Sequence, residues 1–423
     1  MNTAAFKVAV VGGGISGAVC ASTLARNGVS VTLFESARGP GGRMSHRREK
    51  TEDGKELSFD HGAPFFSVSK PEVQSIVQEW ESKGLVAEWK EEFGSFDFHT
   101  RKFNNIEQQV GFSKRFVGVP GMNSICKALC NESGVESKFR VGIGKAEWLD
   151  DEKLWSLTGV DGQNLGQFKG LVASDKNIVS SRVTEVTGQP PPLGLLPKTS
   201  VVSILDGRTN DLVPDRSNAN ELVTRRSLFY PGVSPTPNRH PYDNHIDFSL
   251  VPELSAKLQN LPVQPCFAVM LAFAEPLSSI PFKGVSFENS KVLSWAYCDS
   301  CKPNRETTSE RWVLHSTAEY AEGIISQTGM KKPSDATLNK VAEQLLQEFQ
   351  STGIHIPEPF FKRAHRWGSA FPGARVAPEE KCLWDRNKRV VICGDFCVSP
   401  NVEGAIESGL AAALRLKDSA SCL

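Results

Sequence analysis

The sequence predicts an α/β protein of two domains, one built around a parallel βαβ unit and the other an α+β domain on a mixed sheet. Three observations carry this prediction. A hydrophobic run at 8–11 leads through a glycine-rich turn into a helical pattern and a second hydrophobic run at 31–34. A second strand–glycine–helix pattern begins with a hydrophobic run at 389–393, near the C-terminus. The 423 residues suffice for two hydrophobic cores.

The first turn has the spacing Gly-x-Gly-x-x-Gly, at Gly12, Gly14 and Gly17. Gly12 permits the tight turn, Gly14 lets the backbone approach a diphosphate, and Gly17 lets the helix lie close to the sheet. Free N–H groups at the start of the helix favour phosphate. Glu35 ends the next strand, where a carboxylate can accept the hydroxyl groups of an adenosine ribose. Together these features predict a Rossmann-like dinucleotide-binding domain.

The composition excludes several classes of function. Lysine plus arginine and aspartate plus glutamate both number 48, so no charge excess favours nucleic acid or an anionic membrane surface. No apolar run is long enough to cross a bilayer, and the first strand begins near Phe6, which leaves no room for a targeting peptide in this sequence. We therefore expect a cytoplasmic protein, or the mature form of an imported one, for example in a plastid.

The ten cysteines and eight histidines lack the spacing of a metal site, so no metal is expected. Cys298 and Cys301 form a C-x-x-C pair without a second pair or a thioredoxin-like helix start. We interpret them as two thiols near the end of a strand.

Periodicity and turn residues give the expected order of elements. Helices are expected at 15–27, from about 122 to 131, at 252–261, at 335–351 and from about 404 onward. Strands are expected around 138–148, 153–160 and 168–174, as an antiparallel meander, and at 266–274, 292–297, 312–317 and 389–393.

Residues 198–250 contain five each of proline, asparagine, aspartate and arginine and show no sustained period. Such a stretch does not fit inside a compact core. We therefore predict that 187–250 is a linker followed by a disordered insertion. The cofactor domain would comprise 1–70, 111–186 and 385–423, and the substrate domain 71–110 and 251–384.

The C-terminal pattern indicates which cofactor is bound. Gly394 and Asp395 follow a strand, and Gly404 and Ala405 open an amphipathic helix whose small residues would let a flat ring system sit at its end. The positive helix N-terminus favours the negative charge that a flavin pyrimidine edge gains on reduction. Asp395 would accept a hydrogen bond from a ribityl chain. The alternative is an ordinary strand–turn–helix capped by Asp395.

These blocks resemble the flavoproteins of the amine oxidase superfamily that have two dinucleotide-binding segments, and within them the renalase-like group. The matching features are Gly12 to Glu35, Gly41-Gly42-Arg43, Asp60-His61-Gly62-Ala63, Val119-Pro120-Gly121-Met122, Ala364-His365-Arg366-Trp367-Gly368-Ser369-Ala370, Gly394-Asp395 and Glu403-Gly404-Ala405. The renalase-like pattern commonly has a basic residue after the tryptophan, where this chain has Gly368, and this departure leaves the substrate open.

The resemblance implies FAD as the cofactor. The residues implied for its binding are Gly12, Gly14, Ile15, Ser16, Gly17, Glu35, Ser36, Gly41, Gly42, Arg43, Met44, His61, Gly62, Ala63, Gly394, Asp395, Glu403, Gly404, Ala405 and Ile406. No cysteine occurs at 401–404, where monoamine oxidases attach their flavin, so the FAD is expected to be non-covalent. His61, His365 and Trp367 are the candidates for the substrate-binding wall that faces the flavin.

The implied activity is that of an oxidase, which moves a hydride from a small reduced donor to flavin N5 and passes the electrons to O₂ to give H₂O₂. In the renalase-like group the donor is a dihydronicotinamide isomer, so the expected partner is a small molecule derived from NAD(P)H, with neither nucleic acid nor membrane. One alternative is an amine oxidase or desaturase of the same superfamily. Another is a flavin-free binding protein of the Rab GDP-dissociation-inhibitor type, although Gly394-Asp395 and Gly404-Ala405 look intact. The oligomeric state stays open.

Overall fold

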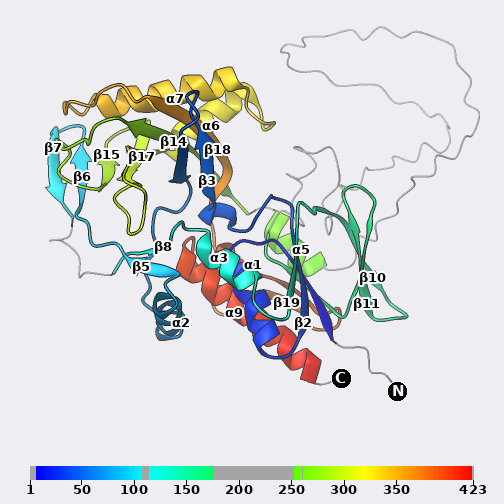
Figure 1. Ribbon diagram of the computed structural model, residues 1–423. Coiled ribbons are helices and arrows are strands. Elements are labelled where there is room, and N and C mark those ends of the chain that lie inside the picture. Colours follow the sequence, from blue (N-terminus) through cyan, green and yellow to red (C-terminus); the bar gives the residue numbers. More distant parts are fainter. Residues whose placement is uncertain (1–5, 107–113, 176–251, 260, 422–423) are drawn as a thin grey trace, which may run out of the picture. The chain divides into compact units, whose positions relative to one another are not determined.

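The computed structural model describes residues 6–106, 114–175, 252–259 and 261–421 (Figure 1). The expected linker and insertion, 187–250, lie outside these residues. Within the described part of the chain, no helix is both long and apolar enough to cross a membrane.

A six-stranded sheet carries the N-terminal turn. Its order is β19 (Leu383–Asp385), β20 (Val390–Ile392), β13 (Gly170–Ala173), β1 (Lys7–Val11), β2 (Ser30–Glu35) and β9 (Val135–Phe139). All neighbours are parallel except β19 and β20. Val8 and Val10 enter one hydrophobic core and Ala9 another, so β1 is buried on both faces, as is usual for a parallel sheet.

Helices cover one face of this sheet and a small antiparallel sheet covers the other. Helices α1 (Ile15–Arg26), α3 (Ser124–Cys130) and α9 (Val402–Ser421) pack together on the first face (Figure 1). The expected meander is present as β10 (Ile143–Leu149), β11 (Leu154–Gly159) and β12 (Asn164–Phe168). Its residues Trp155 and Phe168 share a core with Ala9 and with α5 (Pro252–Gln259). Two of the expected strands are divided between the sheets. The range 138–148 begins at the end of β9 in the parallel sheet and continues in β10, and the range 168–174 is divided because β12 ends at Phe168 and β13 joins the parallel sheet.

The second sheet has seven strands and is mixed, as the sequence predicts. Its order is β18 (Phe361–Pro372), β14 (Val263–Phe273), β17 (Glu310–Ser316), β16 (Leu293–Cys298), β15 (Gly284–Glu288), β6 (Phe93–Asp97) and β7 (Lys102–Asn105). The β15–β6 pair is parallel and the other pairs are antiparallel.

Two helices, α6 (Ala318–Thr328) and α7 (Asp335–Gln350), pack against this sheet (Figure 1). Helix α7 begins at the expected residue 335, because the Ser334 hydroxyl accepts a hydrogen bond from Thr337 N and so caps the first turn. The remaining elements are α2 (Pro71–Ser82), the 3₁₀ turn η1 (Gly42–Met44), α8 (Asp395–Val398), and the strand pairs β3 (His46–Lys50) with β4 (Glu56–Asp60) and β5 (Val86–Glu88) with β8 (Phe116–Gly118).

Candidate functional site

In the glycine turn between β1 and α1, Gly14 borders open space in which a ligand could lie, whereas Gly17 is in close contact with the turn. A Cβ on Gly17 would lie 2.1 Å from the carbonyl oxygen of Gly12, so the helix touches the turn there. A Cβ on Gly14, which has an ordinary φ of −69°, would meet no protein atom within 4 Å. No side chain caps the start of α1 and no acidic residue lies in its first turn. These features fit a diphosphate at the helix N-terminus.

Glu35, at the end of β2, is held beside this turn. Gly13 N donates to Glu35 Oε2 at 2.7 Å, and Ala37 N donates to Oε1 at 2.7 Å. The Ser36 hydroxyl lies 3.4 Å from Oε1. Because each carboxylate oxygen can accept more than one hydrogen bond, Glu35 keeps lone pairs for two ribose hydroxyls.

The loop that follows β2 returns to the glycine turn. Gly41 N donates to Gly13 O at 2.9 Å, and a Cβ on Gly42 would lie 3.4 Å from the Cα of Gly14. Both glycines have positive φ, 136° and 51°, which side chains disfavour. The Met44 side chain is buried in the core, so it could reach a ligand through its backbone alone.

An ion pair joins this loop to the C-terminal segment. Arg43 donates from both terminal nitrogens to Asp395, at 2.6 Å and 2.7 Å, and also to Ala370 O at 3.0 Å. The Asp395 side chain is only 4% exposed, whereas that of Arg43 is 42% exposed. The bidentate pair thus fixes both side chains while one face of the guanidinium remains accessible.

Helix α9 brings the rest of the C-terminal segment to α1. A Cβ on Gly409 would lie 2.4 Å from Ser16 O, so the two helices cross in close contact. Gly394 N donates to the Ser408 hydroxyl at 2.9 Å, which ties the end of β20 to α9. The side chains of Ile15 and Ile406 lie in the same core, and Ala405 is nearly buried.

Glu403 and Gly404 have structural contacts of their own. The Glu403 carboxylate accepts hydrogen bonds from Lys70 N at 2.7 Å and from the Ser69 hydroxyl at 3.0 Å, at the start of α2. Gly404 N donates to Asn401 Oδ1 at 2.7 Å. The Glu403 side chain therefore caps a helix of the protein and does not point to the Arg43–Asp395 pair.

Gly62 and Ala63 lie against Arg43. Ala63 N donates to Arg43 O at 2.9 Å, and a Cβ on Gly62 would lie 1.9 Å from that same oxygen. It would also lie 3.4 Å from the ring of Trp367. Gly62 therefore lies between Arg43, which is predicted to bind FAD, and Trp367, which is predicted to bind the substrate.

Three aromatic side chains form a cluster beside Gly62, which we call the ring cluster. The ring centroids are 4.8 Å apart for His61 and His365, 4.9 Å for His61 and Trp367, and 4.7 Å for His365 and Trp367. Trp367 Nε1 donates to His61 O at 3.1 Å. His365 and Trp367 are alternate residues on β18, so their side chains share one face of the sheet.

The histidines of the ring cluster are neutral at ordinary pH. Burial, together with the neighbouring His365 and Arg47, lowers the pKa of His61 to about 2. Burial, with Arg47 and Arg366, lowers the pKa of His365 to about 4. Arg47 lies 3.2 Å from His365 Nδ1. The cluster therefore presents neutral rings under a positive potential.

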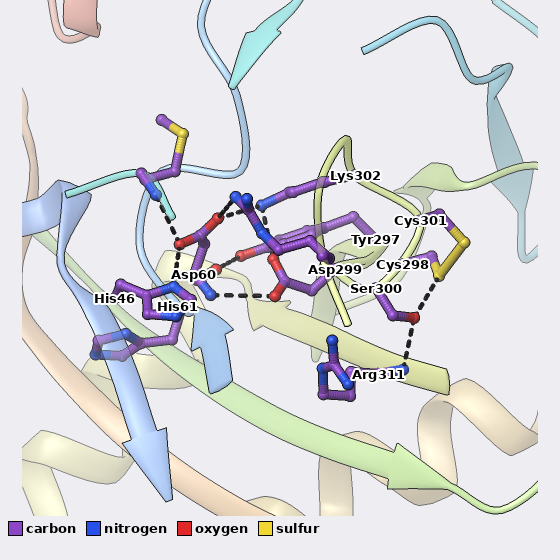
Figure 2. A network of polar contacts seen from close by, with 12 residues as sticks. His46, Asp60, His61, Tyr297, Cys298, Asp299, Ser300, Cys301, Lys302 and Arg311 are labelled. Atoms are coloured by element: carbon purple, nitrogen blue, oxygen red, sulfur yellow. Dashed lines mark hydrogen bonds and ion pairs between the residues drawn. A yellow bond between two sulfur atoms is a disulfide. The ribbon is translucent and has the colours of Figure 1, made fainter. Parts of the chain in front are cut away.

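A network of buried charges lies behind His61 (Figure 2). Asp60 Oδ2 accepts from Arg305 at 2.7 Å and from Lys302 Nζ at 3.1 Å, and Oδ1 accepts from Met122 N at 2.9 Å and from His46 Nδ1 at 2.7 Å. Lys302 also pairs with Asp299 at 2.7 Å. Burial alone would raise the pKa of Asp60, but Lys302, His46 and Arg305 hold it well below its usual range. Removing one partner from such a pair costs about 3–5 kcal/mol, because a buried charge is left unpaired.

The structure corrects the interpretation of Cys298 and Cys301. These residues are joined in a disulfide, with their Cα atoms 5.5 Å apart. Cys298 ends β16, and the turn that follows brings Cys301 back beside it. The spacing alone does not distinguish a disulfide from two thiols. Sequence reasoning also missed Asp299, Lys302 and Arg305, although charged residues so close to an apolar strand were a usable signal.

The residues present fit FAD. The open side of Gly14 and the uncapped helix would hold the diphosphate, Glu35 the adenosine ribose, and the Arg43–Asp395 pair the ribityl region, with the ring system toward Gly62. In the described ranges, no group of three or more histidine, cysteine, aspartate or glutamate side chains could hold a metal ion.

Known families match two separate parts of the chain. Residues 10–80 match the NAD(P)-binding Rossmann-like domain, and residues 235–416 match the flavin-containing amine oxidoreductases. The second match begins inside the expected insertion.

Solved structures share the fold at low identity. A protein described as a protoporphyrinogen oxidase from Exiguobacterium sp. 255-15 superimposes with a TM-score of 0.61 and 11% identity, over 98% of this chain and 99% of that one. Putrescine oxidase with bound putrescine gives 0.54 and 12%, over 97% and 98%. These likenesses show the fold.

A curated relative matches over a short stretch. Carotenoid phi-ring synthase of Streptomyces griseus is 47% identical over 55 residues, which cover 13% of this chain and 11% of that protein. The chain thus matches about a tenth of that relative's length. The expected fold class and the expected FAD cofactor are confirmed by the family matches. Over residues 235–416 the chain thus resembles the flavin-containing amine oxidoreductases, and both its fold and its family matches support an FAD-dependent oxidoreductase.

Proposed function

We propose that this oxidoreductase is a renalase-like oxidase whose electron donor is a small dihydronicotinamide. The observation that carries the proposal is the ring cluster, His61, His365 and Trp367, which walls the approach to Gly62 with neutral aromatic surfaces. When bound, FAD would supply a hydride acceptor at N5 and return the electrons to O₂ as H₂O₂.

The ring cluster suits a flat donor that gives up a hydride without losing a proton. Such a donor needs no catalytic base, and both cluster histidines are held neutral by burial and by neighbouring arginines. Flat rings of the donor can stack on Trp367, with aromatic contacts worth about 0.5–1.5 kcal/mol each.

The charges around the ring cluster oppose a protonated amine. Arg47 lies against His365 and shares the carboxylate of Glu49 with Arg363, and Arg366 lowers the pKa of His365 as well, so the arginines outnumber the carboxylate beside His365. An ammonium group would be repelled there, whereas a neutral or anionic donor would not. These charges favour a dihydronicotinamide over an amine as the donor.

Anaerobic mixing tests the proposal. Protein purified with FAD should be yellow, and acid precipitation should release the FAD, because the chain offers no cysteine at 401–404 to hold it covalently. Mixed without oxygen with a panel of dihydronicotinamide isomers, the flavin absorbance should bleach, and admission of air should restore it with release of H₂O₂.

The same panel must include amines and a carotenoid precursor as competing donors. Bleaching by an amine alone would replace the proposal with an amine oxidase. Bleaching by the carotenoid precursor alone would indicate a desaturase, which the short match to carotenoid phi-ring synthase makes worth including. A protein that takes up no FAD would contradict the enzyme itself.

A further inference from the structure

The loop between β16 and β17, residues 299–309, supplies three hydrogen-bonding partners of Asp60. Asp299 Oδ2 accepts from Asp60 N at 3.3 Å, and Lys302 and Arg305 donate to the Asp60 carboxylate. The Tyr297 hydroxyl, just before the loop, donates to Asp60 O. The backbone N–H, the carbonyl and the carboxylate of Asp60 are thus all bound by one short segment (Figure 2).

Asp60 is in turn the neighbour of a ring-cluster residue. The carbonyl of His61 accepts from Trp367 Nε1 at 3.1 Å and interacts with His315 Nε2 at 3.2 Å. The two successive carbonyls, of Asp60 and His61, are therefore both fixed by side chains of the seven-stranded sheet and its loop. The loop itself holds the N–H and the carboxylate of Asp60, so a shift of the loop changes the contacts of the residue directly before His61.

The disulfide closes the part of the loop that makes these contacts. The ring from Cys298 to Cys301 encloses Asp299, and Lys302 is the next residue after it. Asp299 and Lys302 pair with each other at 2.7 Å, and both side chains are fully buried. The covalent ring therefore restricts the backbone of both members of the pair.

We propose that the Cys298–Cys301 disulfide is a thiol–disulfide site that reacts with dithiols and thereby sets the position of His61. Its effect on donor oxidation rests on the proposed function, but its reaction with dithiols does not. Cys301 is partly exposed whereas Cys298 is fully buried, so the attacking thiolate reaches Cys301.

The reaction balances as an ordinary thiol–disulfide exchange. The thiolate of a dithiol bonds to Cys301 Sγ, the Sγ–Sγ bond breaks, and Cys298 leaves as a thiolate that takes up a proton. The second thiol of the reagent then attacks its own sulfur in the mixed disulfide and releases Cys301. The protein gains two electrons and two protons, and the dithiol becomes a disulfide. Oxidised glutathione would reverse the change.

Dithiothreitol on the FAD-loaded full chain tests this proposal without any variant. In protein that is unfolded without prior dithiothreitol, an alkylating reagent should leave Cys298 and Cys301 unmodified, as measured by mass spectrometry. After treatment with dithiothreitol, the same reagent should modify both cysteines. Reduction should shift the visible spectrum of the bound flavin and lower the rate of donor bleaching about tenfold, because small displacements at a reacting centre have large effects on rate. Oxidised glutathione should restore both.

Matched variants separate the site from general loss of structure. Cys301→Ser should reproduce the reduced protein's spectrum and no longer respond to dithiothreitol. Cys266→Ser is the control, since a serine hydroxyl there can keep the hydrogen bond to Ser316 O and the response should persist. Lys302→Met should shift the spectrum in the same direction as reduction, and Lys302→Arg should restore it in part.

Several results would overturn the proposal. Free Cys298 and Cys301 thiols in untreated protein would do so, as would a spectrum unchanged by complete reduction, or an equal dithiothreitol response in Cys301→Ser. If no donor bleaches the flavin in any state, the proposed function fails. The alkylation and spectral measurements would still decide the thiol–disulfide site.

Discussion

Alanine substitutions at two glycines of the same turn should separate folding from cofactor binding. A Cβ on Gly14 meets no protein atom within 4 Å and the residue has an ordinary φ, so Gly14→Ala should fold as well as the native protein. The open space beside Gly14 is where we place the diphosphate. A methyl group there should weaken FAD binding by at least tenfold, which corresponds to about 1.4 kcal/mol.

Gly17→Ala should behave differently. Its Cβ would lie 2.1 Å from Gly12 O and 2.5 Å from the Ser174 hydroxyl oxygen. Ordinary contact begins near 3.5 Å, so the helix must move away from the turn. Overpacking of this kind costs about 1–3 kcal/mol, and the gain in helix propensity, at most about 1 kcal/mol, offsets only part of it. Both the melting temperature and the FAD affinity should fall.

Thermal melting of the FAD-free proteins and FAD titration by flavin fluorescence are the two assays. Gly323→Ala is the control. A Cβ on this glycine of helix α6 also meets no protein atom within 4 Å, and α6 packs against the seven-stranded sheet, not against the glycine turn. The reasoning is refuted if Gly14→Ala binds FAD as tightly as the native protein, or if it melts as low as Gly17→Ala.

Three further predictions concern acid stability, the ion pair and the insertion. Burial lowers the pKa of His315 from an ordinary 6.5 to about 4 in the folded protein. As the pH falls from about 6.5 to 4, the unfolded chain binds a proton at this residue that the folded protein does not, so the free energy of unfolding decreases. At most about 3 kcal/mol is involved. His315→Gln should reduce this loss in urea titrations at pH 7 and pH 4.5, and an unchanged difference would contradict the assignment. Arg43→Met should destabilise the protein by about 1–3 kcal/mol, since Asp395 loses its bidentate partner. Asp395→Asn in that background should recover part of the loss in melting experiments, and full additivity of the two changes would speak against the pair. Replacing 198–250 by a short glycine–serine linker should preserve soluble protein and FAD binding, and insoluble protein would show that this segment belongs to a core.

Much of the cofactor side of the site was predictable, because its signals are local. Gly12, Gly14 and Gly17 are required by the geometry of one turn, and Glu35 by the length of one helix and strand. Each can be recognised from spacing alone, and the structure places them together. Glu403 shows the limit of this approach. It has the expected position in the chain, but its carboxylate caps α2, a helix distant in sequence.

The substrate side was less predictable for a related physical reason. His365 and Trp367 were named as candidates, but their alternation on β18 and their contact with His61 arise from pairing between strands remote in sequence. The role of Asp60 depends on Lys302 and Arg305, more than 200 positions further along the chain. A charge that is buried only when two sheets meet leaves little trace in local periodicity.

The amino-acid sequence by itself determined the dinucleotide-binding turn and indicated the flavin cofactor, because each of these signals lies in residues close together in the chain. It also predicted a mixed second sheet, but the pairing of strands remote in the chain, such as β6 with β15, came from the tertiary structure. Tertiary structure alone decided that Arg43 would meet Asp395, that Cys298 and Cys301 would be bonded, and that the buried charges of Asp299, Lys302 and Arg305 would surround Asp60. Those contacts exist only after distant segments have packed, when exclusion of water makes each unpaired charge costly enough to select its partner.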